Sequence, residues 1–96
     1  MKYTQTTLNK IEALIEEAGY IVRYERGSFQ SGFCILEDRK VVVLNKFLQL
    51  EGRINTLIDL IPHLKIDVQA LTQESKKWFA DIMGRFHAAN NEEEQS

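Results

Sequence analysis

Cysteine, proline and long apolar runs are nearly absent from this sequence. Cys34 is the single cysteine among 96 residues, so no disulfide can form within the chain, which fits a reducing cytoplasm. No apolar run approaches the ~20 residues that span a bilayer. The initial stretch MKYTQTTLNK also lacks the apolar segment of a secretory signal. We therefore expect a cytoplasmic protein that has no membrane segment.

The chain also lacks a large excess of either charge. Lys and Arg total 12 and Asp and Glu total 14, which gives a net charge of −2. Proteins that bind nucleic acid usually carry a basic patch, so we expect no nucleic-acid partner. Hydrophobic residues make up 44% of the chain, as in ordinary globular domains. We expect one α+β domain over residues 1–89 and a disordered acidic tail, NNEEEQS, over residues 90–96.

Hydrophobic periodicity predicts the first elements of that domain. Apolar residues recur at helical spacing over residues 6–18, and Gly19 is a natural stop for this helix. The following segment YIVRYER alternates in polarity, with Val22 and Tyr24 on one face. Such alternation is typical of a half-buried strand.

Two further strands and two helices are predicted downstream. FCILE and KVVVLN are rich in β-branched and apolar residues and indicate a hairpin. A second helix begins near Leu50, and Pro62 should kink or end it because proline removes a backbone donor. Thr72 is a candidate N-cap of a third helix that runs to about Ala88. The order is α-β-β-β-α-α, and we expect a three-stranded antiparallel meander with three helices.

The two hairpin strands are apolar on both faces, so both faces of the sheet need a cover. We expect a symmetric homodimer to supply it, with KVVVLN as an exposed edge strand. Candidate interaction residues are Val41 and Val43 on that strand and Phe29 in the GSFQSG loop. The monomeric alternative places the first and third helices on opposite faces of the sheet.

The segment GFCILEDRKVVVLNKFLQLEGRINTLIDLIPHL, residues 32–64, resembles the zincin-type peptidase domains of the ImmA/IrrE class. In that class a glycine opens a strand, a second strand ends in Asn, and an Arg precedes a helix that bears HExxH. The positions that match this frame are Gly32, Asn45, Arg53, Leu57 and His63. The resemblance implies a strand–strand–helix unit of the kind that carries the zinc site in these peptidases. It also implies a regulatory protein as partner.

The chain differs from the HExxH motif at two positions that zinc-dependent catalysis requires. Asp59 occupies the position of the first histidine, and Leu60 occupies that of the catalytic glutamate. Leucine cannot accept a proton, so the general base is missing. We therefore expect a non-catalytic domain that binds no metal or cofactor and acts through protein–protein contacts.

An alternative function is a metal-dependent hydrolase that uses Asp59 and His63 as ligands. A zinc site of this kind needs a third protein ligand. The downstream candidates Asp67, Glu74 and Asp81 have no diagnostic spacing. The simpler interpretation places Asp59 and His63 on the solvated face of an amphipathic helix.

Two other residues have structural interpretations. Cys34 is expected to be a buried small hydrophobic residue, because its neighbours are apolar and no Cys-His-Asn pattern accompanies it. His87 lies in the last turn of the third predicted helix, where a cation suits the helix dipole.

Overall fold

The computed structural model describes the backbone of residues 2–26 and 33–95 and the side chains of residues 2–26 and 33–85. Within these ranges the chain forms three α-helices and a three-stranded sheet, which confirms the α+β class. The elements are α1 (Gln5–Glu17), β1 (Ile21–Glu25), β2 (Phe33–Leu36), β3 (Val41–Asn45), α2 (Leu50–Leu60) and α3 (Gln73–Gln95). Short 3-10 turns lie at Glu37–Arg39 (η1), Ile61–His63 (η2) and Val68–Ala70 (η3).

The strand order is β1-β3-β2, so the predicted antiparallel meander is wrong. β2 and β3 do form the predicted antiparallel hairpin, but β1 pairs with the other side of β3 and runs parallel to it. The most apolar strand therefore takes the central place, where both of its edges are hydrogen-bonded. KVVVLN is for the same reason not an edge strand, contrary to the prediction. The two edge positions instead go to β1 and β2, and the charged residues Arg23 and Glu25 of β1 are exposed to water.

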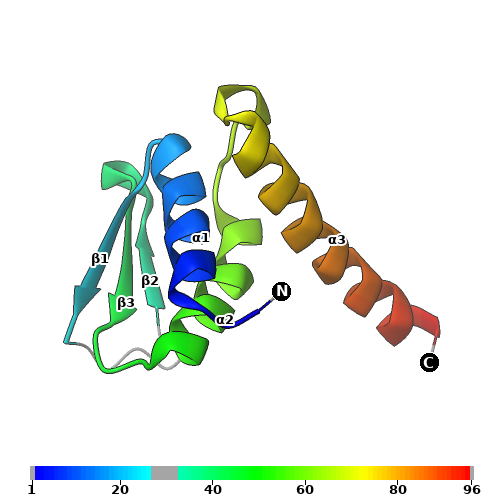
Figure 1. Ribbon diagram of the computed structural model, residues 1–96, viewed down its shortest axis with the longest axis horizontal. Coiled ribbons are helices and arrows are strands. Elements are labelled where there is room, and N and C mark those ends of the chain that lie inside the picture. The colour runs from blue at the N-terminus through cyan, green and yellow to red at the C-terminus, as the bar shows by residue number, and fades with distance from the viewer. Residues whose placement is uncertain (1, 27–32, 96) are drawn as a thin grey trace.

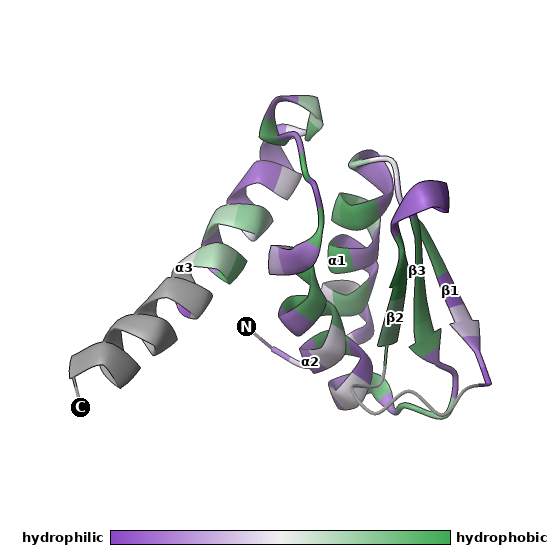
Figure 2. Cartoon of the chain, turned by 180° about the vertical axis from the view of Figure 1, so that it is seen from behind, coloured by the Kyte–Doolittle hydropathy of each residue, from purple (hydrophilic) through white to green (hydrophobic). Residues whose placement is uncertain are grey.

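All three helices lie on one side of the sheet (Figure 1), so the arrangement with α1 and α3 on opposite faces is also wrong. α1 and α2 form the layer next to the sheet, and α3 packs against α1 on the side away from the strands. Figure 2 shows hydrophobic residues in green along β2 and β3 and on parts of α1 and α2. The buried core between these layers includes Leu8, Ile11, Leu14, Ile15, Tyr20, Val42, Leu44, Ile54, Leu57, Leu60 and Ile82.

The predicted helix boundaries at Gly19, Pro62 and Thr72 are confirmed. Gly19 follows α1 with a φ of 95°, in the left-handed region that glycine adopts without strain. α2 ends at Leu60, and the segment that contains Pro62 continues as the 3-10 turn η2. The Thr72 hydroxyl accepts a hydrogen bond from the Ser75 amide at 3.2 Å, as an N-cap does at the start of α3.

The last helix extends beyond its predicted end near Ala88, since α3 spans Gln73–Gln95. The side chains of residues 86–96 lie outside the described part, so the expected disorder of the acidic tail at 90–96 stays a prediction. Within the part of the chain that the structure describes, no helix combines the length and the apolar character needed to cross a membrane.

Candidate functional site

The end of α2 separates the residues that the zincin resemblance brings together. Leu60 is fully buried in the core, whereas Asp59 and His63 are exposed. His63 lies beyond the end of α2, in the 3-10 turn η2 that contains Pro62, so the two side chains are not one α-helical turn apart. Leu60, which stands at the position that the resemblance assigns to the general base, therefore faces the hydrophobic core. Asp59 and His63 form part of the solvated surface.

The candidate third ligands are engaged elsewhere. The Asp67 carboxylate accepts a hydrogen bond from the Gln69 amide at 3.0 Å, as a cap of η3. Glu74 forms an ion pair with Lys10 at 2.5 Å, and Asp81 forms one with Arg85 at 3.4 Å. Across the described side chains, no group of three or more His, Cys, Asp or Glu residues is gathered as metal ligands.

Arg53, a residue of the zincin frame, supports the loop between β3 and α2. Its Nε donates a hydrogen bond to the carbonyl of Leu48 at 2.9 Å, and its Nη2 donates one to the carbonyl of Lys46 at 3.2 Å. Its guanidinium also lies 4.5 Å from the centroid of the Tyr24 ring, a cation–π contact. Arg53 thus has a structural role that explains its presence without zinc chemistry.

A polar cluster joins α1, β1 and α2 through Tyr24. The Tyr24 hydroxyl donates a hydrogen bond to the Glu12 carboxylate, and Arg53 lies over the same ring. Burial first, and then the hydrogen bond and the charge of Glu12, raise the pKa of Tyr24 above its ordinary value of 10.0. The phenol therefore stays protonated at neutral pH. It can donate a hydrogen bond but cannot act as a base.

Two further polar contacts join segments that are distant in the sequence. The buried Tyr20 hydroxyl donates a hydrogen bond to Glu37 at 3.2 Å and accepts one from the Lys65 amide at 3.0 Å. The Glu17 carboxylate accepts hydrogen bonds from the Thr72 amide and the Ser75 hydroxyl, each at 2.9 Å. No buried polar side-chain atom among the described residues lacks a hydrogen-bond partner.

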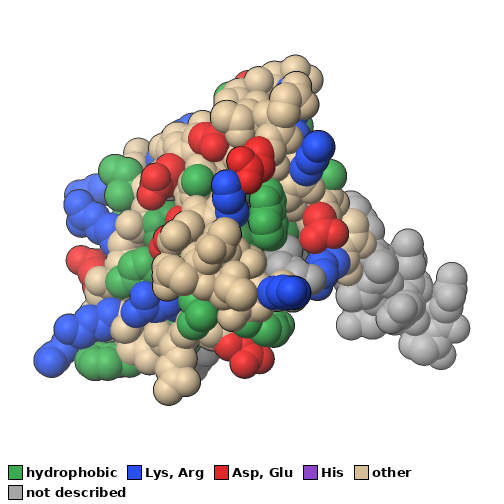
Figure 3. Space-filling model, viewed as in Figure 1, with side chains coloured by type: hydrophobic (Ala, Val, Ile, Leu, Met, Phe, Trp, Pro, Cys, Tyr) green, Lys and Arg blue, Asp and Glu red, His purple; other side chains and the backbone are tan. Residues whose placement is uncertain are grey.

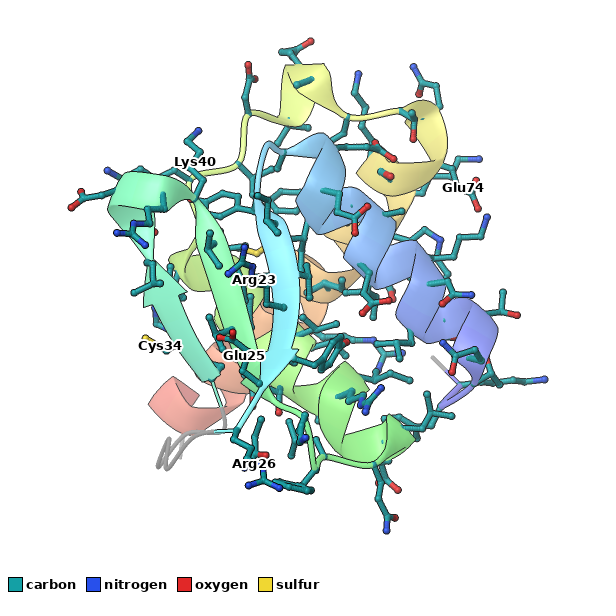
Figure 4. The ribbon with its side chains drawn as sticks, turned by 90° about the vertical axis from the view of Figure 1, so that its left-hand side faces the viewer. Arg23, Glu25, Arg26, Cys34, Lys40 and Glu74 are labelled. Atoms are coloured by element: carbon teal, nitrogen blue, oxygen red, sulfur yellow. The ribbon has the colours of Figure 1, made fainter. Side chains whose placement is uncertain are left out.

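The face of the sheet opposite the helices, here called the outer face, is covered by no described helix (Figure 1). The strand register sets its side chains in rows across β1, β3 and β2. One row is apolar and consists of Ile21, Val41 and Leu36. The next row consists of Arg23, Val43 and Cys34. Figure 4 looks onto this face, with Arg23 and Glu25 on β1 and Cys34 on β2.

Exposure on the outer face is concentrated on the edge strands. Ile21 is 52% exposed and Leu36 is 42% exposed. The candidate interaction residues Val41 and Val43 lie on this face too, but they are only 6% and 5% exposed because side chains of the neighbouring strands flank them. Cys34 is half-buried on the same face rather than fully buried as expected.

Ile21 and Leu36 were missed by the sequence reasoning. The alternation of YIVRYER already separates Ile21, Arg23 and Glu25 from the inward-facing Val22 and Tyr24. The alternation does not show which strands are neighbours in the sheet. It therefore could not predict that Ile21 and Leu36 lie on either side of Val41. Phe29, the third candidate interaction residue, lies outside the described residues.

Comparisons of the chain with protein-family models, with curated proteins and with solved structures found no match. The resemblance to zincin-type domains over residues 32–64 therefore stays a prediction.

Proposed function

We propose that this chain is a non-catalytic α+β domain that acts through protein contacts, including contacts with a second copy of itself. The observation that carries the proposal is the apolar row on the outer face, Ile21, Val41 and Leu36. Two of these three side chains are substantially exposed, and no described helix lies over them. Exposed apolar surface that is organised in this way is typical of an interaction site.

The dimensions of the outer face indicate how strong the self-association is. Three strands at a spacing of ~4.8 Å and five residues at ~3.3 Å each give a face of roughly 14 by 17 Å. A stable interface usually buries about 800 Å² on each partner, which is more than this face provides. We therefore expect a weak symmetric dimer. A two-fold axis near the apolar row would bring the exposed Ile21 and Leu36 of both copies together.

The absence of catalysis in this proposal is supported by the location of Leu60. A general base must reach a metal-bound water, and the residue at this position is instead an apolar side chain in the core. The polar residues beside it, Asp59 and His63, are exposed on either side of the junction between α2 and η2. A regulatory protein, the partner that the zincin resemblance implies, would then bind without being cleaved.

Metal analysis of the purified chain, combined with a peptidase assay in the presence of added zinc, tests the non-catalytic part of the proposal. We expect no stoichiometric metal and no cleavage above a buffer control. Stoichiometric zinc accompanied by peptidase activity that Asp59→Ala or His63→Ala abolishes would overturn it. Sedimentation of the parent chain and of the variants Ile21→Lys and Leu36→Lys tests the self-association.

A further inference from the structure

Phe47 is the most exposed large hydrophobic residue that the structure describes, with a relative accessible surface of 66%. It lies in the loop that connects β3 to α2, at the end of the sheet where β1 and β3 both terminate. In the space-filling view, basic and hydrophobic side chains lie side by side near this end of β1, at the lower left (Figure 3). An aromatic side chain left in water forgoes the hydrophobic stabilisation that its burial would give.

Hydrogen bonds hold the loop that carries Phe47 in place, among them the following four. The Asn45 carboxamide oxygen accepts one from the Phe47 amide at 3.0 Å, and the Lys46 amide donates one to the Glu25 carbonyl at 3.0 Å. Arg53 donates the other two, to the carbonyls of Leu48 and Lys46. The exposed ring is therefore presented by a preformed loop, which lowers the entropic cost of binding a partner.

Two cations flank the ring. The guanidinium carbon of Arg26 lies 5.9 Å from the ring centroid, and Nζ of Lys46 lies 5.3 Å from it. Neither cation forms an ion pair with a carboxylate among the described side chains, although Glu25 directly precedes Arg26 in the chain. Figure 4 shows Arg26 beyond the end of β1, beside the loop. The surface thus combines an exposed aromatic ring with two positive charges that have no ion-pair partner in this part of the chain.

We propose that Phe47, Arg26 and Lys46 form a docking surface for an acidic segment of a partner protein that also carries an aromatic side chain. This inference rests on the proposed function, and it adds the site and the chemistry of the partner. Aromatic residues and arginine are enriched at protein interfaces, and tryptophan, tyrosine and arginine are enriched among the few residues that contribute most to binding. Carboxylates of the partner complement Arg26 and Lys46, while its aromatic side chain covers the exposed ring.

A single-stranded nucleic acid offers a different combination of negative charge and stacking. Such ligands are bound by several aromatic residues along a positively charged groove. At this surface the structure describes a single exposed ring, that of Phe47, and the whole chain has a net charge of −2. The net charge and the single ring at this surface therefore favour an acidic protein segment.

The test is a heteronuclear NMR titration of the full chain with a short peptide of Glu and Asp residues around one central tryptophan. We expect amide shifts concentrated at residues 45–48 and at residue 26, with a submillimolar dissociation constant. A peptide with serine in place of tryptophan should bind about fivefold more weakly, and one with lysine in place of the acidic residues should not bind. Phe47→Ala and Lys46→Glu should each weaken binding about tenfold, equal to ~1.4 kcal/mol.

Val68→Ala is the matched control, because Val68 is another exposed apolar residue, 38% accessible, on the distant turn η3. It should bind the tryptophan peptide as the parent chain does. The inference is overturned if no shifts occur at residues 45–48 at millimolar peptide, or if Phe47→Ala binds as tightly as the parent. It is also overturned if an oligothymidine binds this surface more tightly than the peptide does.

These outcomes are separate from a failure of the proposed function. A chain that self-associates and lacks zinc but ignores the peptide would refute only the docking surface. A chain that contains zinc and cleaves peptides would refute the proposed function even if the acidic peptide bound at Phe47.

Discussion

Ile21 of β1 lies beside Val41 of β3 in a parallel pair, and neither residue belongs to the hydrophobic core cluster between the sheet and the helices. On the other side of Val41 lies Leu36 of β2, so one row of apolar side chains crosses the whole sheet. The central valine is 6% exposed, whereas its two neighbours are 52% and 42% exposed. Substitutions in this row can therefore separate folding from association, since one position is buried in the monomer and two are accessible.

Val43→Lys should lower the free energy of unfolding by about 1–3 kcal/mol, because it places a charge in a nearly buried site. Val43 is 5% exposed on the central strand, and Arg23 is its register partner on β1. Urea denaturation followed by circular dichroism measures the change. Ile21→Lys is the matched control on the same face and should change stability by less than about 1 kcal/mol. Equal effects of the two substitutions would contradict the difference in burial.

Tyr24→Phe should destabilise the chain by about 1–2 kcal/mol, because it leaves the Glu12 carboxylate without its hydrogen-bond donor. Tyr3→Phe removes a hydroxyl that also donates a hydrogen bond, to Asn55, but at an exposed site. It should therefore be nearly neutral. Urea denaturation of both variants gives the comparison, and a Tyr24→Phe variant as stable as the parent would exclude a structural role for the cluster.

Alkaline pH should also act on the chain through Tyr24. Its pKa is raised in the folded state above the ordinary value of 10.0, so the folded chain holds this proton more tightly than the unfolded chain. The corresponding stability is present below the unfolded pKa and is lost as the pH rises above it. Urea denaturation at increasing pH should show a decline above about pH 10 that is smaller in Tyr24→Phe. An identical decline in both proteins would contradict this assignment.

Acidic pH should act through Glu17, which joins α1 to the start of α3. The hydrogen bond from the Thr72 amide is the main cause that lowers the pKa of Glu17 from its ordinary value of 4.5. A lowered pKa gives stability that is present above the unfolded value and is lost as the pH falls below it. Glu17→Gln should therefore make stability less sensitive to pH below 4.5. Urea denaturation of the parent chain and of Glu17→Gln at several pH values below 4.5 measures this difference. The same pH dependence of stability in both proteins would contradict the prediction.

Local signals in the sequence predict much of this fold. Gly19, Pro62 and Thr72 set helix boundaries through short-range backbone chemistry, and the structure confirms all three. The parallel pairing of β1 with β3 was not predicted, because alternation along a strand identifies its faces but not its neighbours. The structure places the most buried strand, β3, at the centre of the sheet, between two strands that are more exposed.

The candidate surfaces were predicted less well, for a related reason. Val41 and Val43 were correctly predicted to lie in a strand, but both are already nearly buried within the single chain. The exposure of Phe47 depends on Arg53, which comes from α2 and holds the loop by its carbonyl groups. Such contacts between elements leave no periodic pattern in the sequence.

Self-association through the outer face is tested most directly by sedimentation equilibrium across micromolar to millimolar concentrations. The parent chain should rise from its monomer mass of 11.1 kDa toward twice that value. Ile21→Lys and Leu36→Lys should remain monomeric, whereas Val68→Lys, an exposed substitution on η3, should associate as the parent does. A parent chain that stays at 11.1 kDa throughout, or an Ile21→Lys variant that associates equally well, would contradict the account.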